Sequence, residues 1–192
     1  MRSLIGIGLV LAASLQATAQ ESVRVITDRA KNTSEVLSGT IQSESPGGLV
    51  IKGRDGKNAT ISPLDIVMVQ YKHESLAPLD FQLIYDRQNM ARNATAPKDQ
   101  ADRLKQAEIA ATKVLDQAGM LQFGRDARCK LAEIRTEIAR MDGKEASVLP
   151  LWKQTALEVK GGWEELPALK ALAEAQESQG SPRKHHDLPN LQ

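Results

Sequence analysis

Apolar and polar residues alternate in short runs along the first part of the chain, up to residue 71. Alternation with a period of two is typical of half-buried β-strands. The pattern predicts five strands, at residues 23–27, 36–41, 49–51, 59–61 and 66–71. The pair Asp55-Gly56 favours a tight hairpin, and residues 62–65 are typical of a single helical turn. Five short strands with tight turns predict a small, strongly bent β-barrel over residues 20–75.

From residue 79 the apolar spacing changes to the three-and-four period of amphipathic helices. Five helices are predicted, at residues 79–90, 98–118, 121–141, 149–159 and 163–173. The first has an untidy apolar spacing, whereas the third has a regular apolar stripe. Short linkers make successive helices antiparallel. Residues 76–176 are therefore predicted to form a helical-hairpin region, either an array similar to tetratricopeptide repeats or a plain bundle. Residues 177–192 are predicted to be a disordered tail.

The first nineteen residues have the three-part pattern of a cleavable signal peptide. Residues 1–2 give a positive start, residues 4–13 are an apolar run, and small residues precede an expected cleavage site between Ala19 and Gln20. A membrane anchor needs about 20 apolar residues, which is twice this run. We therefore expect a periplasmic or extracellular protein without stable membrane insertion after cleavage.

Charge and composition exclude several classes of function. The chain has 25 Lys and Arg against 24 Asp and Glu, so it becomes neutral once Arg2 is removed with the signal. A neutral chain lacks the clustered basic excess of nucleic-acid-binding proteins, so no nucleic-acid partner is expected. Aromatic residues make up only 3%, so the core must be mainly aliphatic. With Cys129 as the single cysteine, a disulfide within one chain is impossible.

Three segments of the strand region carry a recognisable pattern: Leu-Ser-Gly-Thr-Ile at residues 37–41, Gly-Leu-Val-Ile at 48–51 and Ile-Ser-Pro-Leu-Asp-Ile at 61–66. In this order they resemble Sm-like or SH3-like small barrels. Residues 118–127 resemble the repeat-like helices that follow such barrels in uncharacterised exported bacterial proteins. The resemblance covers about residues 23–175. It implies a role in binding or scaffolding, and it names no catalytic residue and no cofactor.

Cys129 and the histidines are the candidate nucleophile and metal-ligand residues. Cys129 would act as a nucleophile if His73 lay beside it as a base, but no nucleophile motif surrounds it. A buried position on a helix is the favoured interpretation. Residues 185–187, His-His-Asp, are the one cluster of metal-ligand types. Adjacent histidines are poorly placed to face one ion, so no metal site is predicted.

Two pairs of acidic residues are candidates for acid–base chemistry. Glu133 and Glu137 lie four residues apart on the third predicted helix, and paired carboxylates are typical of glycoside hydrolysis. Their spacing favours a solvated helix face with local ion pairs. Glu164 and Glu165 stand at the start of the fifth predicted helix, where negative charge suits the helix dipole.

Trp152 and Trp163 are the candidate partner-binding residues, since tryptophan is frequent at the centres of protein interfaces. Both also fall on the apolar stripes of their helices, so the favoured interpretation buries them against each other in the core. Together these observations predict an exported, non-enzymatic protein-interaction or scaffolding module with an unknown protein partner. The alternative is a secreted hydrolase that uses Cys129 or a carboxylate pair. An apolar groove along the helices would favour binding, and a deep polar cleft at Cys129 or Glu133 would favour catalysis.

Overall fold

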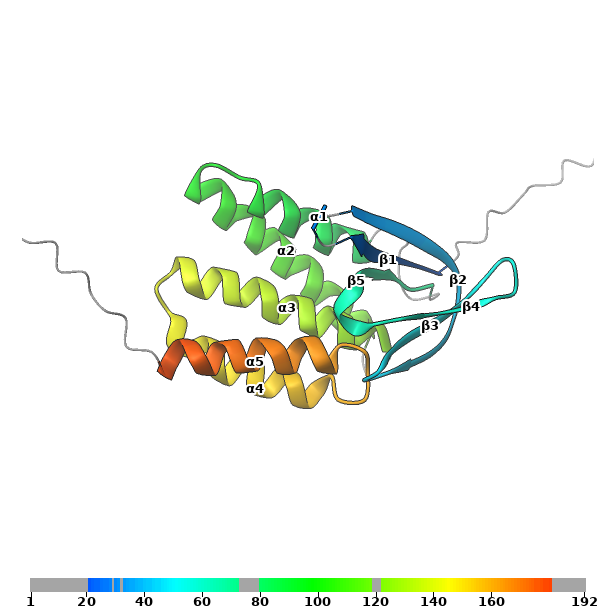
Figure 1. Ribbon diagram of the computed structural model, residues 1–192. Helices are drawn as coiled ribbons and strands as arrows, with labels where there is room; N and C mark the ends of the chain where they lie inside the picture. The colour runs from blue at the N-terminus through cyan, green and yellow to red at the C-terminus, as the bar shows by residue number, and fades with distance from the viewer. Residues whose placement is uncertain (1–20, 29, 32, 73–79, 119–121, 181–192) are drawn as a thin grey trace, which may run out of the picture.

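The computed structural model describes residues 21–28, 30–31, 33–72, 80–118 and 122–180. Within them, an N-terminal antiparallel sheet is followed by five helices, which is an α+β architecture (Figure 1). The predicted signal peptide, His73 and the His-His-Asp cluster at residues 185–187 lie outside the described residues.

The sheet contains all five predicted strands. They are β1 (Glu21–Asp28), β2 (Thr33–Ser45), β3 (Gly48–Gly53), β4 (Asn58–Ile61) and β5 (Ile66–Gln70). Their spatial order is β4-β3-β2-β1-β5, because the chain returns after β4 and pairs β5 with β1. The predicted helical turn is also confirmed, as η1 (Pro63–Asp65) between β4 and β5.

The predicted closure into a barrel is wrong, because the sheet is open. Within the described part of the chain, β4 pairs only with β3 and β5 pairs only with β1. The apolar face of the sheet is covered by helices: Val23, Leu49, Ile51, Ile61 and Val69 share one core with Phe81, Phe123 and Trp163. A sheet covered in this way buries its apolar face without closing on itself. The alternation of apolar and polar residues predicts that one face of the sheet is buried, but it does not predict whether other strands or helices cover that face.

Strand β2 is long enough to pair with two partners, and Gly39 belongs to both pairings. Residues 33–39 pair with β1, and residues 39–45 pair with β3. A Cβ atom on Gly39 would collide with the backbone carbonyl of Lys52, so this close approach of β3 requires glycine. The sheet curves around the ends of the helices (Figure 1).

The five predicted helices are confirmed. They are α1 (Asp80–Arg92), α2 (Pro97–Ala118), α3 (Gln122–Met141), α4 (Val148–Glu158) and α5 (Glu165–Gly180), with the short turn η2 (Glu145–Ser147) before α4. Successive helices are antiparallel, and each packs mainly against its neighbour in the chain (Figure 1). Helix α5 runs to Gly180, four residues into the segment predicted as a tail.

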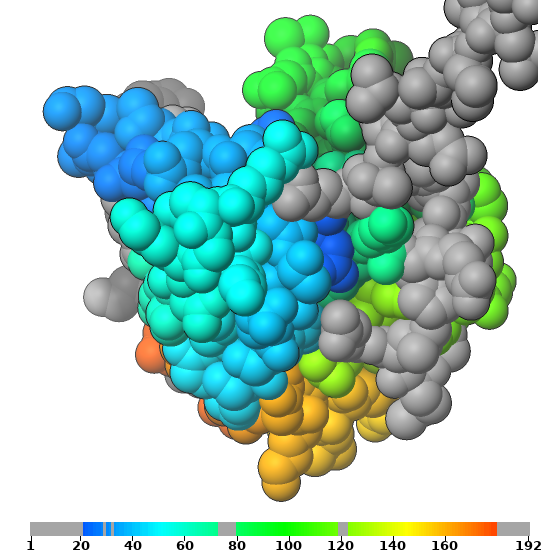
Figure 2. Space-filling model, turned by 90° about the vertical axis from the view of Figure 1, so that its right-hand side faces the viewer, coloured from blue at the N-terminus to red at the C-terminus, as the bar shows by residue number. Residues whose placement is uncertain are grey.

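The core has two parts. The larger part joins the sheet to α1, α2 and α3 and includes Trp163, while the smaller part lies among α3, α4 and α5 and includes Cys129 and Trp152. Figure 2, viewed from the side of the sheet, shows the strands spread over the ends of the helices. Helix α3 contributes to both parts through two faces. Its regular apolar stripe packs in the larger part, whereas Cys129, Ala132 and Ala139 pack in the smaller part.

Candidate functional site

A surface groove of about 470 Å³ lies between α1 and α2. Its walls are formed by Asp80, Leu83, Arg87, Gln106, Ile109, Ala110 and Lys113. Two of these side chains are large, apolar and in contact with water, since Leu83 is 41% exposed and Ile109 is 69% exposed. Apolar side chains gathered in a concave surface are typical of binding sites, whereas scattered single ones are ordinary.

The groove has polar groups at both ends and apolar side chains between them. At one end, the Lys113 ammonium donates to Asp80 Oδ1 at 2.8 Å. This contact sets the register of the two antiparallel helices. Seven residues along each helix from that contact, Arg87 on α1 and Gln106 on α2 form the other end. The exposed apolar side chains lie in the middle.

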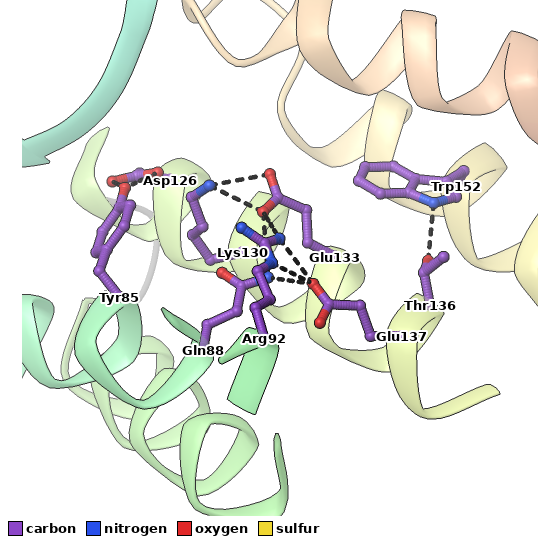
Figure 3. Close-up of polar contacts among 9 residues, drawn as sticks. All are labelled: Tyr85, Gln88, Arg92, Asp126, Lys130, Glu133, Thr136, Glu137 and Trp152. Carbon is purple, nitrogen blue, oxygen red and sulfur yellow. Dashed lines mark hydrogen bonds and ion pairs between the residues drawn. The ribbon is translucent and has the colours of Figure 1, made fainter. Parts of the chain in front are cut away.

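Helix α1 presents two different faces to its surroundings. Its groove-lining residues recur at spacings of three and four, so they share one face. Tyr85, Gln88 and Arg92 recur at the same spacing on a second face, which points toward α3 (Figure 3). The rotation of α1 about its axis therefore decides whether the groove face stays open to solvent.

The burial of Phe81, Ile84 and Ala91 in the core and polar contacts with α3 together fix that rotation (Figure 3). Gln88 Nε2 donates to Glu137 Oε1 at 2.8 Å, and Arg92 donates to the same oxygen at 2.7 and 3.1 Å. Lys130 donates to both oxygens of Glu133 at 2.9 and 3.0 Å. The carboxylates of Glu133 and Glu137 are thus partly buried between helices. The predicted local ion pairing is confirmed for Lys130 and Glu133, which are three residues apart on α3. The predicted solvated face is wrong for Glu137, which binds Gln88 and Arg92 of α1, because the sequence spacing of one helix does not show its neighbour.

A buried pair extends the same contact toward the sheet. The Tyr85 hydroxyl lies 3.1 and 2.9 Å from the two oxygens of Asp126, and the Lys130 ammonium lies 5.0 Å from the centre of the Tyr85 ring. Burial raises the pKa of Asp126 from 3.8 to about 7, although Lys130 and the Tyr85 hydrogen bond oppose the rise. Since Asp126 is fully buried, it joins α1 to α3 rather than facing a substrate.

A second buried charge cluster lies where the sheet meets the helices. Arg125 on α3 donates to Glu44 Oε2 on β2 at 2.8 Å, and its Nε lies 3.5 Å from Glu164 Oε2. Burial, together with the nearby Asp126 carboxylate, raises the pKa of Glu164 from 4.5 to about 9. We infer that Arg125 neutralises Glu44 and that Glu164 is an uncharged acid at neutral pH.

Glu164 and Glu165 lie at the start of α5, as predicted, but their surroundings differ. Glu164, directly before the helix, is fully buried. Glu165 does begin α5, and its carboxylate accepts the backbone N–H of Gly161 at 2.7 Å. The sequence could not show that Glu164 is buried and Glu165 is not, because the burial of Glu164 accompanies its contact with Arg125, 39 residues earlier in the chain.

Cys129 is buried on α3, as the favoured interpretation of the sequence predicts, and it is 4% exposed. It packs in the smaller core with Trp152 and Val159. Burial raises the pKa of its thiol, and the nearby Glu133 carboxylate raises it further. A thiol needs the opposite shift to act as a nucleophile near neutral pH.

The two tryptophans are both buried, but they do not pack against each other. Trp152 Nε1 donates to Thr136 Oγ1 at 2.9 Å in the smaller core (Figure 3). Trp163 Nε1 donates to the Tyr71 hydroxyl at 3.1 Å in the larger core. Each indole N–H is thus satisfied internally, and neither ring is presented to a partner at the surface.

In the part of the chain that the structure describes, no three His, Cys, Asp or Glu side chains are arranged to hold a metal ion. None of the described helices has the length and apolarity that a bilayer crossing requires. Comparison with known proteins gave no match to a family model, to a curated protein or to a solved structure. The function is therefore argued from the groove itself.

The sequence did contain a signal for the groove, in residues that did not fit the helical stripes. Leu83 and Met90 make the apolar spacing of α1 untidy, and both are exposed. Ile109 lies off the buried stripe of α2, which is formed by Leu104, Ala107, Ala111, Val114 and Ala118. An apolar residue off the stripe on each of two adjacent helices marks a surface that packing inside this chain does not use.

Proposed function

We propose that this protein is a non-enzymatic binding module that accommodates an apolar segment of a partner protein in the groove between α1 and α2. The observation that carries the proposal is the exposure of Leu83 and Ile109 within one concave surface. Complete burial of an exposed Leu or Ile side chain contributes roughly 1.5–3 kcal/mol. Because Leu83 is 41% and Ile109 is 69% exposed, only part of that free energy remains to be gained from each when a partner covers them. The contacts between α1 and α3 hold the groove face ready before a partner arrives.

The alternative, a hydrolase using Cys129 or a carboxylate pair, has less support. Cys129 is buried with a raised thiol pKa. Glu133 and Glu137 are bonded to Lys130 and Arg92. A catalytic nucleophile or acid must reach its substrate, so these arrangements favour structural roles for all three groups.

The proposal also includes export of the protein and its relationship to known architectures. The predicted signal peptide at residues 1–19 supports export, and export places the partner in the cell envelope or outside the cell. The consecutive antiparallel helices support a helical-hairpin array similar to tetratricopeptide repeats. The bent sheet, with η1 before its last strand, supports a relationship to Sm-like or SH3-like folds, as in the exported proteins that the sequence resembles.

A pulldown from an envelope extract tests the proposal, with the exported chain, residues 20–192, as bait. We expect a bound protein that is lost with Ile109→Ser and retained with Leu157→Ser. Leu157 on α4 is a matched control, because it is 71% exposed and does not line the groove. Circular dichroism confirms that both variants fold. Equal retention by both variants, or no partner for the unmodified chain, would contradict the proposal.

A further inference from the structure

We infer that the groove selects an acidic partner segment, in which two carboxylates flank a large apolar side chain. This inference rests on the proposed function and adds the chemistry of the occupant. It is based on the charges of the groove walls, on the accessibility of those charges and on the distance between them.

The charges that the groove presents to solvent are positive. Its lining contains Arg87, Lys113 and Asp80. The side chain of Asp80 is only 7% exposed, whereas that of Lys113 is 57% exposed. Arg87 has no ion-pair partner among the described residues. A ligand therefore meets two cationic groups, while the one acidic group lies behind them.

Asp80 holds Lys113 in place for such a ligand. An ammonium group has three N–H donors, and Lys113 gives one of them to Asp80 Oδ1. Among the described residues Lys113 makes no other hydrogen bond, so its remaining donors are available to a carboxylate in the groove that it lines. Because Asp80 is buried on α1, the ammonium is positioned before binding, which lowers the entropic cost of the new contact.

The two cationic groups lie at opposite ends of the groove. Asp80, which binds Lys113, and Arg87 are seven residues apart on α1, which corresponds to about 10 Å at 1.5 Å per residue. Leu83 and Ile109 lie between them. The matching occupant has two acidic groups about 10 Å apart, with an apolar side chain between. In a helix these are residues i and i+7 around an apolar residue at i+3 or i+4.

Selection from a random 12-residue peptide library displayed on phage tests the inference, with the exported chain as target. We expect the enriched peptides to share a large apolar residue flanked by Asp or Glu. Their affinity is expected to fall about three- to tenfold with Arg87→Gln, because an ionic hydrogen bond is lost. It should be restored by Arg87→Lys and unchanged by Lys153→Gln, which alters an exposed lysine on α4.

The outcomes separate this inference from the proposed function. Peptides that depend on Ile109 but are neutral or basic, or that ignore Arg87→Gln, overturn the acidic specificity and leave groove binding standing. If no enriched peptide depends on Ile109, both fail. Dimerisation of the chain through the groove, seen as a concentration-dependent mass that Ile109→Ser abolishes, would overturn the acidic-segment inference as well.

Discussion

The indole N–H of Trp163 donates to the hydroxyl of Tyr71 at 3.1 Å, across 92 residues of sequence. Tyr71 directly follows the last strand, and Trp163 lies just before α5. The Tyr71 ring also packs against Phe81 and Phe123, with ring centres 5.7 and 6.1 Å apart respectively. This contact therefore joins the sheet to the helices inside one core, and we expect the two halves to unfold together.

A double-mutant cycle measures the strength of that contact. Tyr71→Phe and Trp163→Phe each remove one partner of the hydrogen bond, and the double variant removes both. We expect a coupling free energy of about 1 kcal/mol in urea unfolding, because the bond is buried and Tyr71→Phe leaves the indole N–H of Trp163 without its partner. Additive single effects, with coupling within about 0.3 kcal/mol of zero, would contradict this prediction.

The pKa of Glu164, which burial raises from 4.5 to about 9, predicts a pH-dependent stability. Between these values the folded protein binds more protons than the unfolded chain. The free energy of unfolding that Glu164 contributes is therefore fully present below about pH 4.5 and is lost as pH rises through about 9. Glu164→Gln removes this dependence, so its stability relative to the unmodified protein should rise by at least about 2 kcal/mol between pH 5 and 8.5.

Denaturant unfolding at a series of pH values checks the Glu164 prediction. Glu177→Gln is the matched control, because Glu177 is an exposed residue of α5, and it should follow the unmodified protein. If the two curves of Glu164→Gln and the unmodified protein stay parallel over this range, Glu164 is not held as an uncharged acid.

Gly162 leaves the room that the buried charge cluster needs. A Cβ atom there would collide with Arg125 Nε and Glu164 Oε2. We expect Gly162→Ala to lower the free energy of unfolding by about 1–3 kcal/mol, with a melting temperature several degrees lower. At Gly47, an added Cβ would lie 3.6 Å from Ser45 Oγ, an ordinary contact, so Gly47→Ala is the control. Equal melting temperatures for the two variants would refute the crowding argument.

Cys129 should be inert in the folded protein. Its burial and raised thiol pKa predict very slow reaction with a disulfide reagent such as Ellman's at about pH 8. Unfolding in concentrated guanidinium chloride should release the single thiol at once. We also expect Cys129→Ser to fold normally and to keep partner binding. Rapid labelling of the native chain, or a disulfide-linked dimer on a non-reducing gel, would show that the thiol is accessible.

The elements of this fold follow from local patterns, but their assembly does not. Strand alternation, the Asp55-Gly56 pair and the stripe on α3 each depend on nearby residues, and each prediction is confirmed. Closure of the sheet depends on what covers its inner face. That cover is provided by Phe81, Phe123 and other residues of the helical half, which no local period reveals.

The same limit applies to the candidate sites. The burial of Glu164 depends on its contact with Arg125, and that of Glu137 on Gln88 and Arg92, and all of these partners are distant in sequence. The charge and spacing of one segment could not predict those contacts. The groove is formed by two helices together, so the sequence of either helix alone could not predict it. Leu83 and Ile109, which lie off the buried stripes of their helices, were its only local indication.

Photo-cross-linking in living cells tests the central claim most directly, because it reports which surface the partner touches. A benzophenone-bearing amino acid is introduced in place of Ile109 in the full-length chain, or in place of the equally exposed Leu157 as the control. Groove binding predicts a light-dependent protein adduct at position 109 and none at position 157, and the acidic specificity predicts in addition that Arg87→Gln weakens the adduct at position 109. An adduct of equal yield at both positions, or one at position 157 alone, would contradict the proposed function.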